Sequence, residues 1–178
     1  VRSEEADYLI TTAPLGVMQK MNINLSEDMA AAIKATSGSP ACKIGVEFNH
    51  RFWEQNDMIY GGVTSTDIPG HRILSYPSGN LSGSAHGDTG VILGYYPIGG
   101  QSVPISNLSM AERTEFALSV GEKIHPGNYR KYFTGESISV AWHKMKYALA
   151  GWENWSPRGR TRSFPVMQKG DNRIFSTG

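Results

Sequence analysis

The sequence predicts an α+β domain built around a mixed β-sheet. Two segments show the 3.6-residue apolar spacing of helices, and several short runs are rich in β-branched or aromatic residues. The chain has 178 residues, 39% of them hydrophobic, so it can bury a sizeable core. Its 20 glycines and 9 prolines indicate many turns and argue against a long coiled coil.

The strands are predicted from short apolar runs bounded by turn residues. The first run lies just before Pro14, which ends it, and the last stops at the glycine of position 178. Both ends of the chain therefore lie in strand-like runs, and we expect both to be cut from a longer protein. The predicted strands are residues 8–12, 43–48, 59–63, 72–76, 91–96, 137–142 and 173–178.

Two helices are predicted from their caps and apolar faces. Ser26 is a good N-cap for a helix over residues 27–36, with two acidic residues in its first turn. Ser109 and Glu112 form a capping-box pattern that opens a helix over residues 110–124. Residues 156–171 mix basic residues with serine, proline and glycine, and are predicted to be a long polar loop.

Charge and motif content exclude several function classes. Seventeen basic and sixteen acidic residues give a net charge of +1, so no global field attracts nucleic acid or an anionic membrane. No apolar run approaches the ~18 residues of a membrane helix. The five histidines are scattered without metal-ligand spacing, so no metal is expected. The single cysteine, Cys42, lies in an apolar strand, where a buried structural thiol is the usual role.

Lysine and tyrosine positions suggest a binding site on the sheet. Lys43 lies on the strand side opposite Ile44, beside Gly45, whose missing side chain allows close approach by another group. Tyr95 and Tyr96 end an apolar strand, where a phenol can pack its ring and offer its hydroxyl to a polar group. A strand-end lysine and a core tyrosine are the structural alternatives.

Aromatic residues crowd a short segment near the C-terminus. Trp142, Tyr147, Trp152 and Trp155 fall within fourteen residues, with Gly151 among them. This is more aromatic surface than a small loop needs, and it suits a planar ligand.

Ordered motifs over nearly the whole chain resemble the flavin amine oxidases, specifically the L-amino-acid oxidases. The motifs are the 6–16 segment ADYLITTAPLG, Lys43-Ile44, Phe52-Trp53-Glu54, Gly61-Gly62, Tyr76-Pro77, the 90–95 segment GVILGY, Trp142 with Lys146-Tyr147-Ala148, and Arg173-Ile174-Phe175. The size of the chain and its abrupt ends are most similar to a C-terminal fragment of a bacterial L-glutamate oxidase.

This resemblance implies a domain organisation. Residues 1–17 would be a strand and turn of an FAD-binding α/β domain, residues 18–155 a substrate-binding domain, and residues 156–178 a loop and strand returning to the FAD-binding domain. Other segments of the same precursor would complete the FAD-binding domain, since the FAD glycine fingerprint and the substrate-clamping arginine belong to upstream sequence.

The resemblance also implies roles for individual residues. Lys43 matches the family lysine that holds a water near the flavin. Tyr95, or Tyr96 after a one-residue shift, matches the tyrosine that binds the substrate carboxylate, and Gly151-Trp152 lies where the family lines the substrate side. Ala150 replaces the first glycine of that lining. The residues implied to contact FAD are Thr12, Pro14, Trp142, Tyr147 and Gly178.

The implied activity is oxidation of an L-amino acid by dioxygen to a 2-oxo acid, ammonia and hydrogen peroxide, with FAD as cofactor. The implied partners are the other fragments, the small-molecule L-amino acid and dioxygen, in a dimer of the assembled complex that is secreted; the fragment alone would be inactive. Two alternatives stay open. One is an oxidase for amines that lack a carboxylate, and the other is a non-catalytic binding domain.

Overall fold

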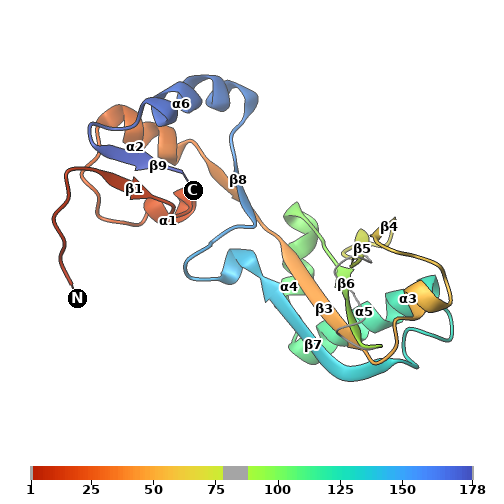
Figure 1. Ribbon diagram of the computed structural model, residues 1–178. Coiled ribbons are helices and arrows are strands. Elements are labelled where there is room, and N and C mark those ends of the chain that lie inside the picture. The colour runs from red at the N-terminus through yellow and green to blue at the C-terminus, as the bar shows by residue number, and fades with distance from the viewer. Residues whose placement is uncertain (1, 78–87, 178) are drawn as a thin grey trace. The chain divides into compact units, whose positions relative to one another are not determined.

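The computed structural model describes residues 2–77 and 88–177, which form two compact units (Figure 1). One unit comprises residues 1–39 with 142–178, and the other comprises residues 40–141. These divisions differ from the boundaries expected at 17/18 and 155/156. Which residues serve an FAD-binding domain and which a substrate-binding domain therefore stays a prediction.

The unit of residues 40–141 is built on a five-stranded sheet in the order β4-β5-β6-β3-β7. Each pair of neighbouring strands is antiparallel. Antiparallel pairing lets the chain return through short turns rather than crossover helices. The strands are β3 (Cys42–Phe48), β4 (Gly62–Ser65), β5 (Ile73–Tyr76), β6 (Gly90–Tyr95) and β7 (Phe133–Ala141).

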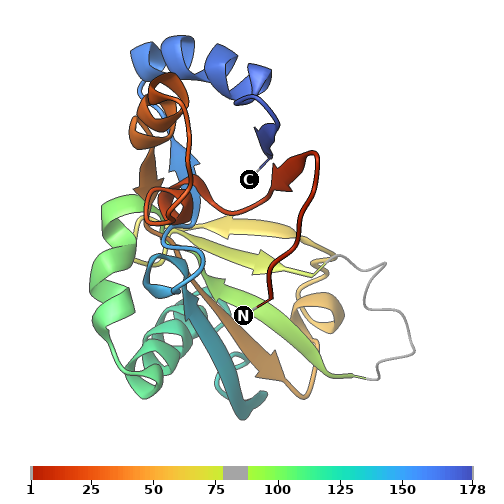
Figure 2. The same ribbon diagram turned by 90° about the vertical axis from the view of Figure 1, so that its left-hand side faces the viewer.

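Helices cover one face of this sheet. The opposite face, which we call the open face, carries the exposed side chains of Val91 and Ile138 among the described residues of this unit. α4 (Ser102–Asn107) and α5 (Met110–Ile124) both contact β3, and Figure 2 shows them beside the sheet. Every second residue of β3, from Cys42 to Phe48, is fully buried, whereas the residues between them are half-buried. The period of two places Lys43, Gly45 and Glu47 together on the open face. The unit also contains α3 (Phe52–Gln55) and the short 3₁₀ helix η2 (Gly99–Gln101).

The other unit packs three helices against two short strand pairs. β1 (Leu9–Thr11) runs parallel to β9 (Ile174–Ser176), and β2 (Ser37–Ser39) runs antiparallel to β8 (Trp152–Asn154). The helices are α1 (Leu15–Met18), α2 (Glu27–Lys34) and α6 (Pro157–Lys169), with a 3₁₀ turn η3 (Trp142–Lys144). The α+β class is thus confirmed, with parallel and antiparallel pairings in separate sheets. No helix in the described ranges is both long and apolar enough to cross a bilayer.

Helix α5 has the bounds that its sequence predicts. The Ser109 side chain accepts from the Glu112 backbone N–H, and the Glu112 carboxylate accepts from the Ser109 N–H, completing the capping box. Ser26 likewise caps α2, which ends at Lys34, two residues before the predicted end. Strong local caps make these two helices readable from sequence alone.

The prediction of a polar loop over residues 156–171 is wrong, because α6 occupies most of that segment. Ser156 caps it by accepting from the Gly159 N–H. Pro157 lies in the first turn, where a backbone N–H has no hydrogen-bond partner within the helix, so its missing N–H costs no hydrogen bond. Gly159 and Pro165 lower the intrinsic helix propensity of the segment. Packing overrides that preference, since Met167 is buried in one cluster with Met29 and Ile33 of α2.

Two predicted strands start three or more residues away from their observed start, whereas the other five match the structure to within two residues at each end. β4 begins at Gly62, three residues after the predicted start, because Gly61 and Gly62 both have positive φ and turn the chain there. β7 begins at Phe133, four residues before the predicted start, and crosses an irregularity beside Gly135, whose φ is 98°. Trp142 lies outside the strand, at the start of η3.

Candidate functional site

The predicted site residues fall into two groups, one in each unit. Lys43, Tyr95 and Tyr96 belong to the sheet unit. The other unit holds Thr12, Pro14, Trp142, Tyr147, Gly151 and Trp152. Gly178, predicted to contact FAD, lies outside the described residues.

A β-bulge in β6 decides which tyrosine reaches the open face. Ile44 pairs with Tyr95 and Gly45 pairs with Leu93, so Gly94 is an extra residue without a partner on β3. A Cβ at Gly94 would lie 3.0 Å from a Val46 methyl, so this position also faces the core. The bulge therefore turns two successive residues, Gly94 and Tyr95, inward and places Tyr96 on the other side.

Tyr95, the preferred carboxylate ligand in the sequence analysis, is a core residue. It is 0% exposed, and its hydroxyl lies 3.1 Å from the Ser139 Oγ. Burial raises the pKa of Tyr95, so the phenol stays neutral. The simple alternation of a strand assigns Tyr95 to the open face, and the extra residue at Gly94 reverses that assignment. Tyr95 is thus not placed to bind a ligand on the open face.

Lys43 and Tyr96 come together instead. The Lys43 ammonium lies 4.2 Å from the centroid of the Tyr96 ring, within the range of a cation–π interaction. Gly45 does not leave an open space beside them, because its Cβ position lies 3.3 Å from a Val91 methyl and 3.6 Å from an Ile138 methyl. The open face thus presents an ammonium and a phenol beside the apolar side chains of Val91 and Ile138.

The other unit contains a tryptophan-rich cavity of about 460 Å³. Four predicted site residues line it, namely Pro14, Trp142, Gly151 and Trp152, together with Leu15, Ala148, Ala150, Glu153 and Trp155. Thr12 and Tyr147 are not among the lining residues. Tyr147 is exposed, with the Lys146 ammonium 5.0 Å from its ring centroid.

Glu153 is a functional candidate that the sequence analysis missed. Its Oε1 accepts from the Gly16 N–H at 2.9 Å, whereas its Oε2 is buried with no hydrogen-bond partner among the described residues. A buried carboxylate oxygen without a donor is costly, and the Gly16 bond to the other oxygen offsets only part of that cost. The tryptophan walls of the cavity suit a planar ring system, and an isoalloxazine is one. The residues present therefore fit a flavin.

Ala150 stands where the resemblance implies a glycine, and its methyl fits because the residue packed against it, Gly38, has no side chain. The Cβ of Ala150 lies only 2.7 Å from the position that a Cβ on Gly38 would occupy. Glycine at position 38 of β2 thus accommodates the Ala150 methyl, and the adjoining Gly151 N–H donates to the Ser39 carbonyl at 2.8 Å. The β2–β8 pair keeps the cavity wall in place.

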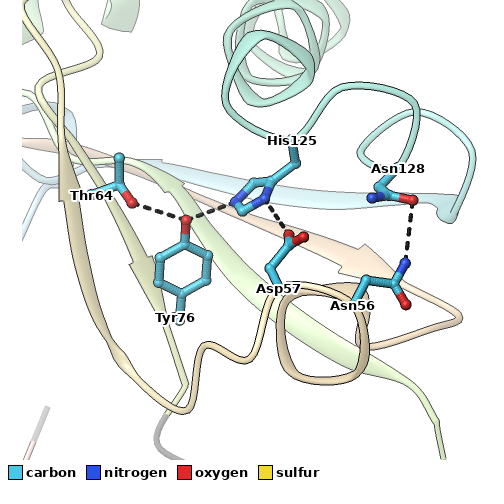
Figure 3. Close-up of polar contacts among 6 residues, drawn as sticks. All are labelled: Asn56, Asp57, Thr64, Tyr76, His125 and Asn128. Atoms are coloured by element: carbon cyan, nitrogen blue, oxygen red, sulfur yellow. Dashed lines mark hydrogen bonds and ion pairs between the residues drawn. The ribbon is translucent and has the colours of Figure 1, made fainter.

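A second polar cluster in the sheet unit was not predicted (Figure 3). His125 Nδ1 lies 2.7 Å from the Asp57 Oδ2, His125 Nε2 lies 2.7 Å from the Tyr76 hydroxyl, and that hydroxyl lies 2.9 Å from the Thr64 Oγ1. We call these four residues the His125 relay. They come from four separate segments, so no sequence spacing reveals them. Tyr76 is buried, and burial raises the pKa of its phenol.

The His125 relay is satisfied internally. Asp57 only accepts, so His125 Nδ1 donates to it; in neutral His125, Nε2 then accepts from Tyr76, which in turn accepts from Thr64. A neutral phenol held this way is a poor nucleophile, which argues against a hydrolase triad. The hydrogen bonds of the relay instead connect β4 and β5 to the C-terminal end of α5.

Comparisons with known proteins agree on one family. A family model described as flavin containing amine oxidoreductase matches residues 1–178. An L-amino-acid oxidase of Neurospora crassa is 28% identical over 158 residues, which cover 84% of this chain and 23% of that protein. The L-glutamate oxidase precursor of Streptomyces diastatochromogenes is 30% identical over 90 residues, covering 51% of this chain and 13% of that protein.

Solved structures share the fold. A putrescine oxidase with bound putrescine superposes with a TM-score of 0.78 at 12% identity, over 97% of this chain and 37% of that chain. The present chain also spans only 23–36% of the length of the first two curated relatives that it matches. It therefore corresponds to one part of such proteins.

Proposed function

Because the chain belongs to the flavin containing amine oxidoreductase family, we propose that it is part of an FAD-dependent L-amino-acid oxidase, with L-glutamate as the first substrate to test. The overall reaction would convert an L-amino acid, dioxygen and water into a 2-oxo acid, ammonia and hydrogen peroxide. The observation that carries the proposal is the pairing of Lys43 with Tyr96 on one face of the sheet.

Lys43 and Tyr96 supply the donors that this chemistry needs. The Lys43 ammonium has three donors and no acceptor, so it can hold and orient the water that hydrolyses an imino acid. The Tyr96 hydroxyl can donate to a substrate carboxylate, which is costly to bury without directed donors. When bound, FAD supplies the two-electron redox chemistry.

The tryptophan-rich cavity is proposed to hold the ring of the cofactor. Trp142, Trp152 and Trp155 offer flat apolar walls for that ring. Pro14 would contact FAD at this cavity, which it also lines, and Thr12, Tyr147 and Gly178 are proposed to contact FAD elsewhere. Gly151 and Trp152 would line the substrate side.

The parallel pair β1–β9 supports the proposal that other segments complete the protein. Leu9 and Ile10 of β1 are exposed, as is the neighbouring Tyr8. Parallel sheets occur almost only with both faces covered, and two strands alone are marginally stable. We propose that further fragments of the precursor cover this pair, and that the assembled complex is a secreted dimer.

The test is an assay of the complete assembled protein. Its absorbance spectrum should show oxidised flavin, and it should release 2-oxoglutarate, ammonia and hydrogen peroxide in equal amounts from L-glutamate, with other L-amino acids compared beside it. Each amino acid is paired with its decarboxylated amine, which for L-glutamate is 4-aminobutanoate. Faster turnover of the amines would favour an amine oxidase, which the putrescine oxidase fold also accommodates. A protein without flavin would favour a non-catalytic binding domain.

A further inference from the structure

The Ser139 hydroxyl contacts both β3, which carries Lys43, and β6, which ends at the residue before Tyr96. Ser139 lies on β7 opposite Ile44 of β3. Its Oγ donates to the Lys43 carbonyl at 2.8 Å and lies 3.1 Å from the Tyr95 hydroxyl on β6. One side chain therefore touches the backbone of Lys43 and the residue next to Tyr96.

Counting protons fixes the direction of each bond. A serine hydroxyl has one hydrogen and two lone pairs. Its hydrogen goes to the Lys43 carbonyl, so the Tyr95 hydroxyl and the Arg113 Nη1, which lies 3.3 Å away, must both donate to it. These three bonds use its hydrogen and both lone pairs, and the Cys42 Sγ lies 3.7 Å from the same oxygen. A substitution at any one of these groups therefore changes the hydrogen bonds that the others can make.

Arg113 anchors this hydroxyl from α5. Its Nε donates to the Leu108 carbonyl at 3.1 Å, and its Nη2 donates to the Ser106 carbonyl at 2.5 Å. The guanidinium is a rigid fork, so these two bonds fix where the third nitrogen points. α5, β7, β3 and β6 therefore converge on one oxygen.

This convergence lies behind the proposed site rather than in it. The Ser139 hydroxyl faces α5, whereas Lys43 and Tyr96 project from the opposite face of the sheet. Tyr95 occupies its inward position because of the bulge at Gly94, and its bond to Ser139 holds that position. The same bulge turns Tyr96 outward toward the Lys43 ammonium.

We propose that Ser139, anchored by Arg113, is a positioning residue that sets the separation of Lys43 and Tyr96 by bonding the Lys43 carbonyl and the Tyr95 hydroxyl together. This inference rests on the proposed function, because it gives Lys43 a role in turnover. The Ser139 hydroxyl faces α5, on the side of the sheet opposite Lys43 and Tyr96, so its effect on the half-reaction that Lys43 serves has to pass through Lys43.

The test is a double-mutant cycle in the complete flavin-bound protein. Rates of flavin reduction and reoxidation are measured by stopped flow for the parent, Ser139→Ala, Lys43→Met and the double variant. We expect Ser139→Ala to slow, by about five- to tenfold, the same half-reaction that Lys43→Met slows. In the Lys43→Met background the same substitution should change that rate by less than about twofold, because the two effects then share one route.

Ser137→Ala is the matched control. Ser137 lies two residues away on the same face of β7 and bonds to Thr114 of α5 at 2.7 Å, but not to Lys43. It should leave both half-reactions within about twofold of the parent. If Ser139→Ala fails to assemble, Tyr95→Phe removes one donor from the same oxygen without a cavity and should give a smaller effect of the same pattern.

The outcomes separate the two claims. One outcome is that Lys43→Met slows its half-reaction while the rate losses of Ser139→Ala and Lys43→Met simply multiply in the double variant. That result overturns the positioning role of Ser139 and leaves the proposed function unaffected. Equal slowing by Ser137→Ala also overturns it, since any loss of a sheet-to-α5 bond would then suffice. Parent rates for Lys43→Met overturn the proposed role of Lys43 and the positioning inference with it.

Discussion

The Lys43 ammonium lies 4.2 Å from the centroid of the Tyr96 ring, on the face of the sheet that the helices leave open. The two residues are 53 positions apart and meet because β3 and β6 are neighbours with a bulge at Gly94. This contact gives the open face a positive charge and a phenol side by side. The proposed chemistry depends on both.

Lys43→Met should keep the flavin bound and slow one half-reaction by roughly a hundredfold, because it removes the charge and three donors at nearly constant length. Stopped-flow measurement separates reduction from reoxidation. Lys131→Met is a matched control, since Lys131 also lies over a tyrosine ring, that of Tyr132 at 4.6 Å, but on the exposed surface. If Lys43→Met keeps the parent rates in both half-reactions, Lys43 has no role in turnover and is only a lysine at a strand end.

The His125 relay should stabilise the sheet unit. Tyr76→Phe leaves the His125 Nε2 without its donor and should lower the free energy of unfolding by about 1–3 kcal/mol. Asp57→Ala should cost a similar amount, and the two losses should be less than additive, because both act on one histidine. Denaturant unfolding of the complete protein measures Tyr76→Phe, Asp57→Ala and the double variant.

Asn56→Ala is the control for the relay. Its amide lies 3.5 Å from the Asn128 Oδ1 in an exposed position (Figure 3), so its loss should change stability by less than about 0.5 kcal/mol. Additive losses for Tyr76→Phe and Asp57→Ala would show that the relay does not act as a unit.

His71 should make the fold sensitive to acid. It is fully buried, and burial lowers the pKa of its imidazole to about 4. Between pH 6.5 and about 4 the unfolded chain binds a proton that the folded chain does not, so stability falls as the pH is lowered through this window. The loss should be on the order of 2–3 kcal/mol.

His71→Leu removes this titration, so the slope of unfolding free energy against pH should flatten between pH 6.5 and 4. Ser119→Ala, which removes no titratable group, is the control and should keep the slope of the parent. An unchanged slope in His71→Leu would assign the acid sensitivity to other groups.

The elements that could be predicted from the sequence are those marked by residues close together in the chain. α5 was predicted with its observed bounds because the Ser109–Glu112 capping box lies entirely within four residues. α6 was missed because its stability comes from the contact of Met167 with the α2 cluster, which no local pattern shows. The segment Ser156-Pro157 was the one available hint, as a cap followed by a proline at the first position.

The site was predictable in its residue types but not in its geometry. Lys43 and the tyrosine pair were identified, but one extra residue at Gly94 reverses which tyrosine faces outward, and pairing registers are not visible in one sequence. Glu153 was missed because its partner, Gly16, lies 137 residues away. The sequence signal that could have found it is an acidic residue between two tryptophans in a short strand.

The proposed role of Tyr96 in binding the substrate carboxylate requires its outward position. The measurement that reports on this role is the ratio of kcat/KM for an L-amino acid to that for its decarboxylated amine. Tyr96→Phe should lower this ratio by roughly ten- to a hundredfold, the value of one hydrogen bond to a charged group. Tyr95→Phe acts on Tyr96 only indirectly, so it should change this ratio by less than about twofold. A larger fall in the ratio for Tyr95→Phe, with none for Tyr96→Phe, would show that Tyr95 and not Tyr96 binds the carboxylate.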